Sequence, residues 1–133
     1  MDLYADNILD HARHPHRKSP LPSPTVEHEE RNASCGDTLT LQLTIEDGRV
    51  TDVGWAGDGC AISQAGMSLL SDELTGKTER ELEALTKTDV LGLLGVDVGP
   101  RRLKCALLSL HALKNALHRW KKEPEQGWNE TMG

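Results

Sequence analysis

Residues 38–55, TLTLQLTIEDGRVTDVGW, determine the fold of this chain. In the first half, leucine or isoleucine alternates with threonine, glutamine or glutamate, which predicts a strand with one face on a core and the other facing water. The dipeptide Asp47-Gly48 follows, and it is typical of a tight hairpin turn because glycine readily adopts the positive φ that such turns need. The sequence therefore predicts an antiparallel hairpin whose second strand covers about residues 49–55.

The flanking segments predict one more strand and several helices. A further strand is expected near residues 26–31. Thr78 and Glu81 have the spacing of a capping box, which marks the start of a short helix. The segment 89–99 carries no clear pattern, and the polar segment 121–133 is expected to be a frayed tail. The expected helices cover residues 2–14, 61–74, 79–86 and 103–121.

This order of elements gives a fold class. Strands and helices are segregated along the chain, so the class is α+β, with a small three-stranded antiparallel meander packed against several helices. A chain of 133 residues fits one domain over 1–133, with a core of about 3–120 and a tail of 121–133.

Charge and hydropathy exclude some functions. The formal net charge is -6, and no cluster of lysine and arginine predicts a nucleic-acid surface. No apolar run is long enough to cross a membrane. The first twenty residues lack the apolar core of a secretory signal, so we expect a cytoplasmic protein.

The three cysteines, Cys35, Cys60 and Cys105, are the most informative residues for function. An odd number in a reducing compartment favours thiol chemistry or a metal over a disulfide framework, although three buried and inert cysteines would also fit. Cys60 and Cys105 fall at the starts of predicted helices, where the helix dipole lowers the pKa of a thiol. Lys104, together with an arginine pair just before it, adds positive charge beside Cys105.

The stretch ASCGDT, residues 33–38, places a carboxylate two residues after the first cysteine. Three thiolates and the Asp37 carboxylate provide the four ligands of a tetrahedral metal site, on Cys35, Asp37, Cys60 and Cys105. A carboxylate exchanges more readily than a thiolate at a soft metal, so Asp37 predicts a site that can open. The spacing matches no zinc-finger pattern.

Several motifs resemble one known family. The opening LYADNILDHARHP, the SCGD motif, the GDGCAIS motif and the RLKCALLSLHAL motif occur in the order found in the IscU/SufU/NifU N-terminal domain family of iron–sulfur cluster assembly proteins. The resemblance covers about residues 3–118 and implies a SufE/NifU-like fold. It also implies that Cys35, Asp37, Cys60 and Cys105 bind zinc, or else Fe²⁺ and a transient [2Fe–2S] cluster.

The resemblance further implies partners and two possible roles. A pyridoxal-phosphate cysteine desulfurase of the SufS/IscS type would deliver persulfide sulfur to one of the cysteines. We expect Cys35, on the most mobile loop, to be the acceptor, with Cys105 as the alternative. Downstream SUF or ISC assembly components, or apo-iron–sulfur proteins, would then receive sulfur or the cluster. The chain would be a zinc-dependent sulfurtransferase of the SufU type, or a non-enzymatic scaffold of the IscU type. A structural zinc domain that only binds a partner is a third possibility.

The motifs that separate the two branches of the family conflict. The stretch PRRLKC resembles the SufU pattern, with Arg102 at the family's arginine and Lys104 where IscU-like members carry histidine. The separation between Cys60 and Cys105 lacks the SufU insertion and is closer to IscU. The chaperone-recognition motif of IscU and the carboxyl-terminal Cys-x-x-Cys domain of full NifU are both absent. Arg102 and Lys104 are either partner contacts or ordinary solvated charges, and we favour a contact for Arg102.

Histidines give a weaker signal. His11, His14 and His16 resemble a metal cluster together with Asp10, but we expect His11 to be a packing or capping residue and the other two to be exposed. His111 and His118 lie two helical turns apart and are expected at the surface. Two tryptophans, Trp55 and Trp120, are expected in the core.

Overall fold

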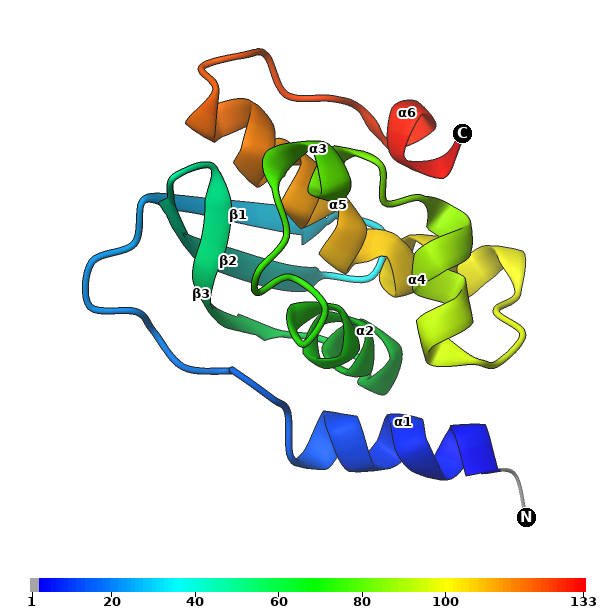
Figure 1. Cartoon of the computed structure of the whole chain (residues 1–133). Helices are drawn as coiled ribbons and strands as arrows, with labels where there is room; N and C mark the ends of the chain where they lie inside the picture. Colours follow the sequence, from blue (N-terminus) through cyan, green and yellow to red (C-terminus); the bar gives the residue numbers. More distant parts are fainter. Residues whose placement is uncertain (1–2) are drawn as a thin grey trace.

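The protein is built on one antiparallel sheet (Figure 1). The structure is a computed structural model that describes the backbone of residues 3–133 and the side chains from Ala5 onward. The strands β1 (Val26–Asn32), β2 (Asp37–Glu46) and β3 (Arg49–Asp58) pair in the order β1-β2-β3. The predicted meander and the α+β class are therefore confirmed.

The hairpin between β2 and β3 forms as the sequence predicts. Asp47 and Gly48 have φ values of 52° and 74°, and the flanking residues Glu46 and Arg49 pair across the turn. Two successive positive φ values are the mark of a type I′ turn, whose twist matches that of the strands. Every second residue of β2 is buried from Asp37 to Leu43, so the strand turns one face toward the helices.

Helices cover that apolar face. The two that pack on the sheet are α2 (Ala61–Ser71) and α5 (Leu103–Trp120), and α1 (Leu3–Arg13) lies against α2 on the side away from α5 (Figure 1). None of the helices in the described part of the chain is long and apolar enough to span a membrane. The remaining helical elements are α3 (Glu79–Glu83), α4 (Lys87–Leu94), the 3₁₀ turn η1 (Pro100–Arg102) and α6 (Trp128–Met132).

Helix boundaries follow local capping signals. The predicted capping box of Thr78 and Glu81 is present and starts α3. A second box, formed by Thr86 and Asp89, starts α4 in a region where the sequence analysis assigned no helix. The helix expected over 61–74 ends earlier, at Ser71. Residue 2, where the first helix was expected to begin, lies outside the described residues.

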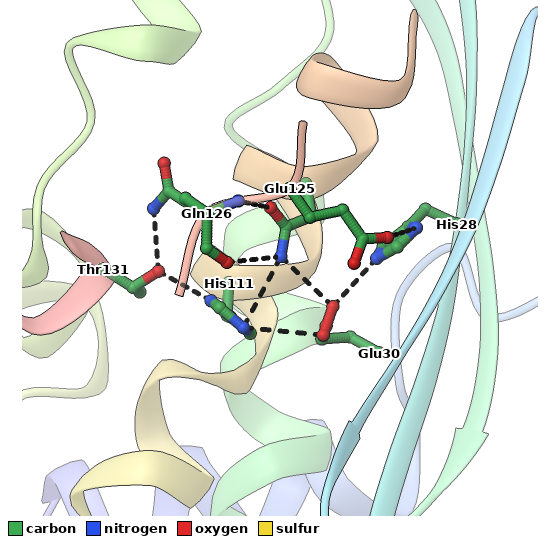
Figure 2. Close-up of polar contacts among 7 residues, drawn as sticks. His28, Glu30, His111, Glu125, Gln126 and Thr131 are labelled. Carbon is green, nitrogen blue, oxygen red and sulfur yellow. Dashed lines mark hydrogen bonds and ion pairs between the residues drawn. The ribbon is translucent and has the colours of Figure 1, made fainter. Parts of the chain in front are cut away.

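The carboxyl-terminal segment is ordered, so the expectation of a frayed tail is wrong. It folds back onto α5 and ends in α6 (Figure 1). The Gln126 backbone N–H donates to Asn115 Oδ1 at 2.7 Å, and Asn115 Nδ2 donates to the Gln126 carbonyl at 3.2 Å. His111 Nδ1 and Thr131 Oγ1 are 2.7 Å apart (Figure 2). His111 is only 3% exposed, so the surface position expected for it is also wrong, because this segment covers it.

Two tryptophans expected in the core differ in depth. Trp55 is 1% exposed, and its ring N–H donates to the His16 carbonyl at 2.8 Å. Trp120 is half-buried and packs against the edge of the core. The Trp55 hydrogen bond ties the long connection between α1 and β1 to β3.

Candidate metal centre

Four chain segments converge where the predicted ligands lie. Cys35 is in the turn between β1 and β2, and Asp37 is the first residue of β2. Cys60 is the N-cap residue of α2, directly after β3. Cys105 is in the first turn of α5. The sheet and the two helices that cover it thus bring together residues separated by as many as seventy positions.

The ligand atoms of three of these residues form a compact group. The Sγ atoms of Cys35 and Cys105 are 3.1 Å apart, and together with an Asp37 oxygen they all lie within 4.8 Å of one another. Among the described residues, this is the one group of metal-ligating side chains that meets this condition. Cys60 lies outside it but contacts Asp37. Its Sγ is 3.6 Å from Oδ2, and its backbone N–H donates to Oδ1 at 3.3 Å.

Two glycines shape the site for different reasons. Gly36 has a φ of 78°, the left-handed conformation that lets the turn place Cys35 and Asp37 side by side. Gly59 is needed for space, because a Cβ there would lie 2.8 Å from Asp37 Cγ and would also meet the Ser63 hydroxyl. The GDGC stretch therefore lets β3 pass directly over the Asp37 carboxylate before α2 begins.

The thiols and the carboxylate differ in exposure. Cys35 and Cys60 are exposed, whereas Asp37 and Cys105 are 4% and 5% exposed. Burial raises the pKa of the Cys105 thiol, and the neighbouring Cys35, Cys60 and Asp37 raise it further. The expectation that the α5 amino terminus lowers this pKa is therefore wrong for the metal-free protein, because burial and acidic neighbours outweigh the helix dipole. A bound divalent cation reverses this balance, since a coordinated thiol is deprotonated.

The donor set fits a zinc ion. Thiolate and carboxylate are both common zinc ligands, and the predicted set supplies four of them. Asp37 is buried, yet none of the ion pairs found among the described residues joins it to a lysine, arginine or histidine. A buried carboxylate normally needs a cationic partner or a metal. The acidic character of the site thus agrees with a bound cation.

Sequence reasoning missed Asn32 and Ser63. Asn32 ends β1, and its Nδ2 donates to Cys35 Sγ at 3.0 Å and approaches Cys105 Sγ at 3.8 Å. The Ser63 hydroxyl lies 4.0 Å from Cys60 Sγ. An asparagine shortly before a glycine-containing turn is a typical turn initiator, and this signal was available in the sequence.

The basic residues near Cys105 point in other directions. The Lys104 ammonium lies over the Trp128 ring, 5.6 Å from its centroid. Arg101 and Arg102 belong to η1 and are exposed. Arg102 borders a mostly apolar hollow that it shares with residues of α1 and the start of α2, including Leu9 and Ile62. These residues therefore surround the centre without contacting the sulfur atoms.

The amino-terminal histidines do not form a metal cluster among the described residues. His11 is buried, with its Nδ1 2.7 Å from Ser68 Oγ, as expected for a packing residue. His16 is exposed and pairs with Asp72, with Nδ1 and Oδ2 2.5 Å apart. His14 is also exposed, as expected.

Comparison with known proteins agrees with the motifs. The family model for the NifU-like N-terminal domain matches residues 3–126, nearly the whole chain. The chain belongs to the NifU-like N-terminal domain family. It is 34% identical over 131 residues to the iron–sulfur cluster assembly scaffold protein IscU of Thermotoga maritima, a match that covers 86% of this chain and 92% of the relative.

Relatives from both branches of this NifU-like family match the chain. It is 29% identical over 132 residues to the zinc-dependent sulfurtransferase SufU of Bacillus subtilis, covering 86% of this chain and 89% of the relative. A solved structure of a scaffold protein for the SUF system from Fervidobacterium islandicum superposes with a TM-score of 0.73 at 26% identity, over 84% of this chain and 94% of that one. The NifU-like fold expected from the sequence is thus confirmed, and relatives of both branches share it.

Proposed function

We propose that this chain is an iron–sulfur cluster assembly protein that holds zinc on Cys35, Asp37, Cys60 and Cys105 and relays sulfur from a cysteine desulfurase. The observation that carries the proposal is the compact group of two thiols and a buried carboxylate, with a third thiol against that carboxylate. Family membership and the zinc-dependent SufU relative support it.

Cys35 has the properties of the sulfur acceptor. It is exposed, so a persulfide carried by another protein can reach it, and Cys105 is almost fully covered. In the transfer, the Cys35 thiolate attacks the outer sulfur of the desulfurase persulfide. A new S–S bond forms at Cys35, the old S–S bond breaks, and the desulfurase cysteine leaves as a thiolate. No electrons are gained or lost overall.

The surrounding residues support this exchange. Zinc, when bound, keeps the ligating thiols deprotonated at neutral pH. Asp37 is the ligand whose carboxylate exchanges most readily, which allows the coordination to change while the buried Cys105 stays in place. Arg102 is exposed at the border of the apolar hollow beside α2, where it is available for contact with the desulfurase.

A scaffold role is the second candidate. It is favoured by the identity to the Thermotoga IscU protein and by the short separation between Cys60 and Cys105. In that role the same four side chains hold iron and sulfide as cargo, and a [2Fe–2S] cluster passes to an apo-protein. Both candidates use the same ligands, so an experiment on the product has to separate them.

The deciding experiment is anaerobic reconstitution with a cysteine desulfurase, cysteine and ferrous iron, followed by desalting. A sulfur relay predicts retained zinc, little iron, and faster alanine production by the desulfurase. A scaffold predicts nearly stoichiometric iron and acid-labile sulfide that can be transferred to an apo-ferredoxin. If the protein retained no zinc, gained no iron or sulfide and had no effect on the desulfurase, both roles would be contradicted.

The acceptor residue is tested by mapping the persulfide. After brief exposure to the loaded desulfurase, thiol alkylation and peptide mass spectrometry should find the extra sulfur on Cys35. The Cys35→Ser variant should show none. Labelling mainly on Cys105 in the unmodified protein would instead identify the alternative acceptor.

A further inference from the structure

We infer that Asn32 is a positioning residue of the metal centre, whose side-chain amide holds Cys35 beside Cys105. The inference rests on the metal-binding part of the proposed function. It extends that proposal by naming a residue that contacts the ligands and is not itself a ligand. Three features of Asn32 support it: the orientation of its amide, its burial, and the chemistry of an amide donor.

The orientation of the Asn32 amide is fixed by the turn that follows it. Its Oδ1 accepts the Ser34 backbone N–H at 3.2 Å. An amide oxygen is the acceptor in such a bond, so Nδ2 has to be on the other side, toward the sulfur atoms. The Asn32 carbonyl also accepts the backbone N–H groups of Cys35 at 3.3 Å and Gly36 at 2.8 Å. One residue therefore fixes both the turn and the direction of its own donor.

The position of Asn32 in the fold lets it join two elements. It is the last residue of β1 and pairs in register with Asp37 of β2. Its side chain is 3% exposed and reaches from the sheet toward Cys105 in α5. The 3.0 Å bond to Cys35 and the 3.8 Å approach to Cys105 place the amide between the exposed thiol and the buried one.

The chemistry of an amide suits this task. An N–H group that donates to an anionic sulfur makes a charge-assisted bond, which is stronger than a bond between neutral groups. The amide does not titrate, so it remains a donor whether the sulfur is bound to metal, free or persulfidated. Residues that orient metal ligands in this way typically change metal affinity or activity by about 10- to 100-fold when they are removed.

Cys60 provides the internal contrast. Its sulfur has contacts with the Asp37 carboxylate and the Ser63 hydroxyl, both longer than the Asn32–Cys35 bond. We therefore expect Cys35 to stay oriented when it leaves the metal, and Cys60 to be less restrained. A thiol that receives sulfur has to be oriented, since attack on a persulfide requires alignment with the S–S bond. Cys35 meets this requirement.

The test uses variants that separate the role of Asn32 in the turn from its role as a hydrogen-bond donor to the thiols. In Asn32→Ser, a hydroxyl can still accept the Ser34 N–H, but it is too short to donate to the sulfurs. In Asn32→Asp, the shape and the turn acceptor remain, and the donor is replaced by a charged oxygen. Asn115→Ser is the matched control, because Asn115 is also a buried asparagine at the β1–α5 interface and its amide bonds to Glu30 and the Gln126 carbonyl instead.

The readouts are zinc affinity by chelator competition, the rate of zinc release, and the intensity of sulfur-to-cobalt charge transfer in the Co²⁺-substituted protein. We expect Asn32→Ser to weaken zinc binding by about 10- to 100-fold, with weaker charge transfer, and Asn32→Asp to weaken it more. Asn115→Ser should lower the stability and leave zinc binding within about twofold of the unmodified protein.

Zinc affinity and charge transfer within about twofold of the unmodified protein in both Asn32 variants would overturn the inference. A loss in Asn115→Ser as large as in Asn32→Ser would also overturn it, because the effect would then follow general stability. If one of the Asn32 variants does not fold, the zinc affinity and charge transfer of the other variant decide the test. None of these readouts uses a desulfurase, so failure of the sulfur-relay proposal is detected separately by reconstitution.

Discussion

The interface between β1 and α5 carries two groups of potential metal ligands, and the two groups behave differently. The cysteine end, where β1 finishes and α5 begins, holds Cys35 and Cys105 with the Asp37 carboxylate, and their acidic groups face one another without a cationic partner among the described residues. The second group lies within β1 and the middle of α5 and holds His28, Glu30 and His111, side chains that bind metals in many proteins.

In the second group the carboxylate is surrounded by donors. Glu30 Oε2 lies 2.8 Å from His28 Nε2 and accepts a bond from Asn115 Nδ2 at 3.3 Å (Figure 2). Glu30 Oε1 is 3.5 Å from His111 Nε2. The carboxyl-terminal segment covers this group, with Glu125 Oε1 3.5 Å from His28 Nδ1. We call it the Glu30 cluster.

The comparison shows what makes a group of ligating residues a metal site. In the Glu30 cluster the carboxylate accepts hydrogen bonds from neighbouring side chains of β1 and α5, so it has partners within the protein. At the cysteines the buried Asp37 carboxylate has no cationic side chain paired with it among the described residues, which agrees with a bound cation. Residue type alone does not distinguish the two groups, since histidine and glutamate are as capable of binding zinc as cysteine and aspartate.

The largest expected effect is at the cysteine end. Cys105→Ser removes one of four ligands from a site whose total binding energy is roughly 10–16 kcal/mol in comparable structural zinc sites, so zinc affinity should fall by about 100- to 1,000-fold. Chelator competition measures this change. His111→Gln, in the Glu30 cluster, should keep its zinc, and equal loss from both variants would remove the distinction between the two groups.

Removal of Glu30 should mainly affect stability. Glu30→Ala leaves two histidines and the Asn115 amide without their shared acceptor, and breaking such a buried network should lower the free energy of unfolding by about 2–4 kcal/mol. Urea denaturation of the metal-free protein measures this loss of free energy of unfolding. Glu30→Gln retains an acceptor and should be milder. Zinc stoichiometry should stay at one per chain, and its loss would mean that the two groups are coupled.

Trp128 tests how firmly the carboxyl-terminal segment closes the Glu30 cluster. Its ring is stacked on His111, with centroids 4.0 Å apart, and it receives the Lys104 ammonium on its face. Trp128→Leu retains apolar area but loses the stacking and the cation–π contact, so the stability should fall by about 1–2 kcal/mol. Protection of the His118 and Gln126 amides from hydrogen exchange should fall with it. An unchanged exchange pattern would show that the segment is held without Trp128.

The smallest expected effect is a dependence of stability on pH. Burial lowers the pKa of His111, and the charge of His28 lowers it further, while Glu30, Glu125 and Glu130 act in the opposite direction. The unfolded protein therefore binds the His111 proton more readily, and the stabilisation present above the ordinary pKa of about 6.5 is lost as the pH falls through the lower folded-state value.

Urea unfolding of the metal-free protein should thus show lower stability at pH 5.5 than at pH 7.5. His111→Gln should reduce this difference, because glutamine does not titrate. A steeper pH dependence in the variant would mean that His111 is stabilised in its charged form.

Much of the fold and most of the candidate site could be predicted from local patterns. The alternation in β2 and the Asp47-Gly48 turn are local signals, and both occur as expected. The positions of the cysteines beside a glycine turn and at two helix starts follow from the same signals. The capping box of Thr86 and Asp89 is a local signal of the same kind, and it marks the start of α4.

Other features depend on contacts between distant segments. The tail has no apolar periodicity, and it is ordered because Asn115 and His111 hold its backbone and side chains. For the same reason His111 is buried, although its place on a helix resembles that of a surface residue. The raised pKa of Cys105 arises from burial and from acids contributed by other elements, which a helix position does not reveal.

X-ray absorption at the zinc edge of the zinc-loaded protein tests the proposed ligand set directly. We expect one zinc ion with three sulfur neighbours at about 2.3 Å and one oxygen neighbour at about 2.0–2.2 Å, from Cys35, Cys60, Cys105 and Asp37. A first shell with imidazole nitrogen, or with only two sulfurs, would contradict it. The first result would place zinc in the Glu30 cluster or another histidine site, and the second would show that Cys60 does not join the centre.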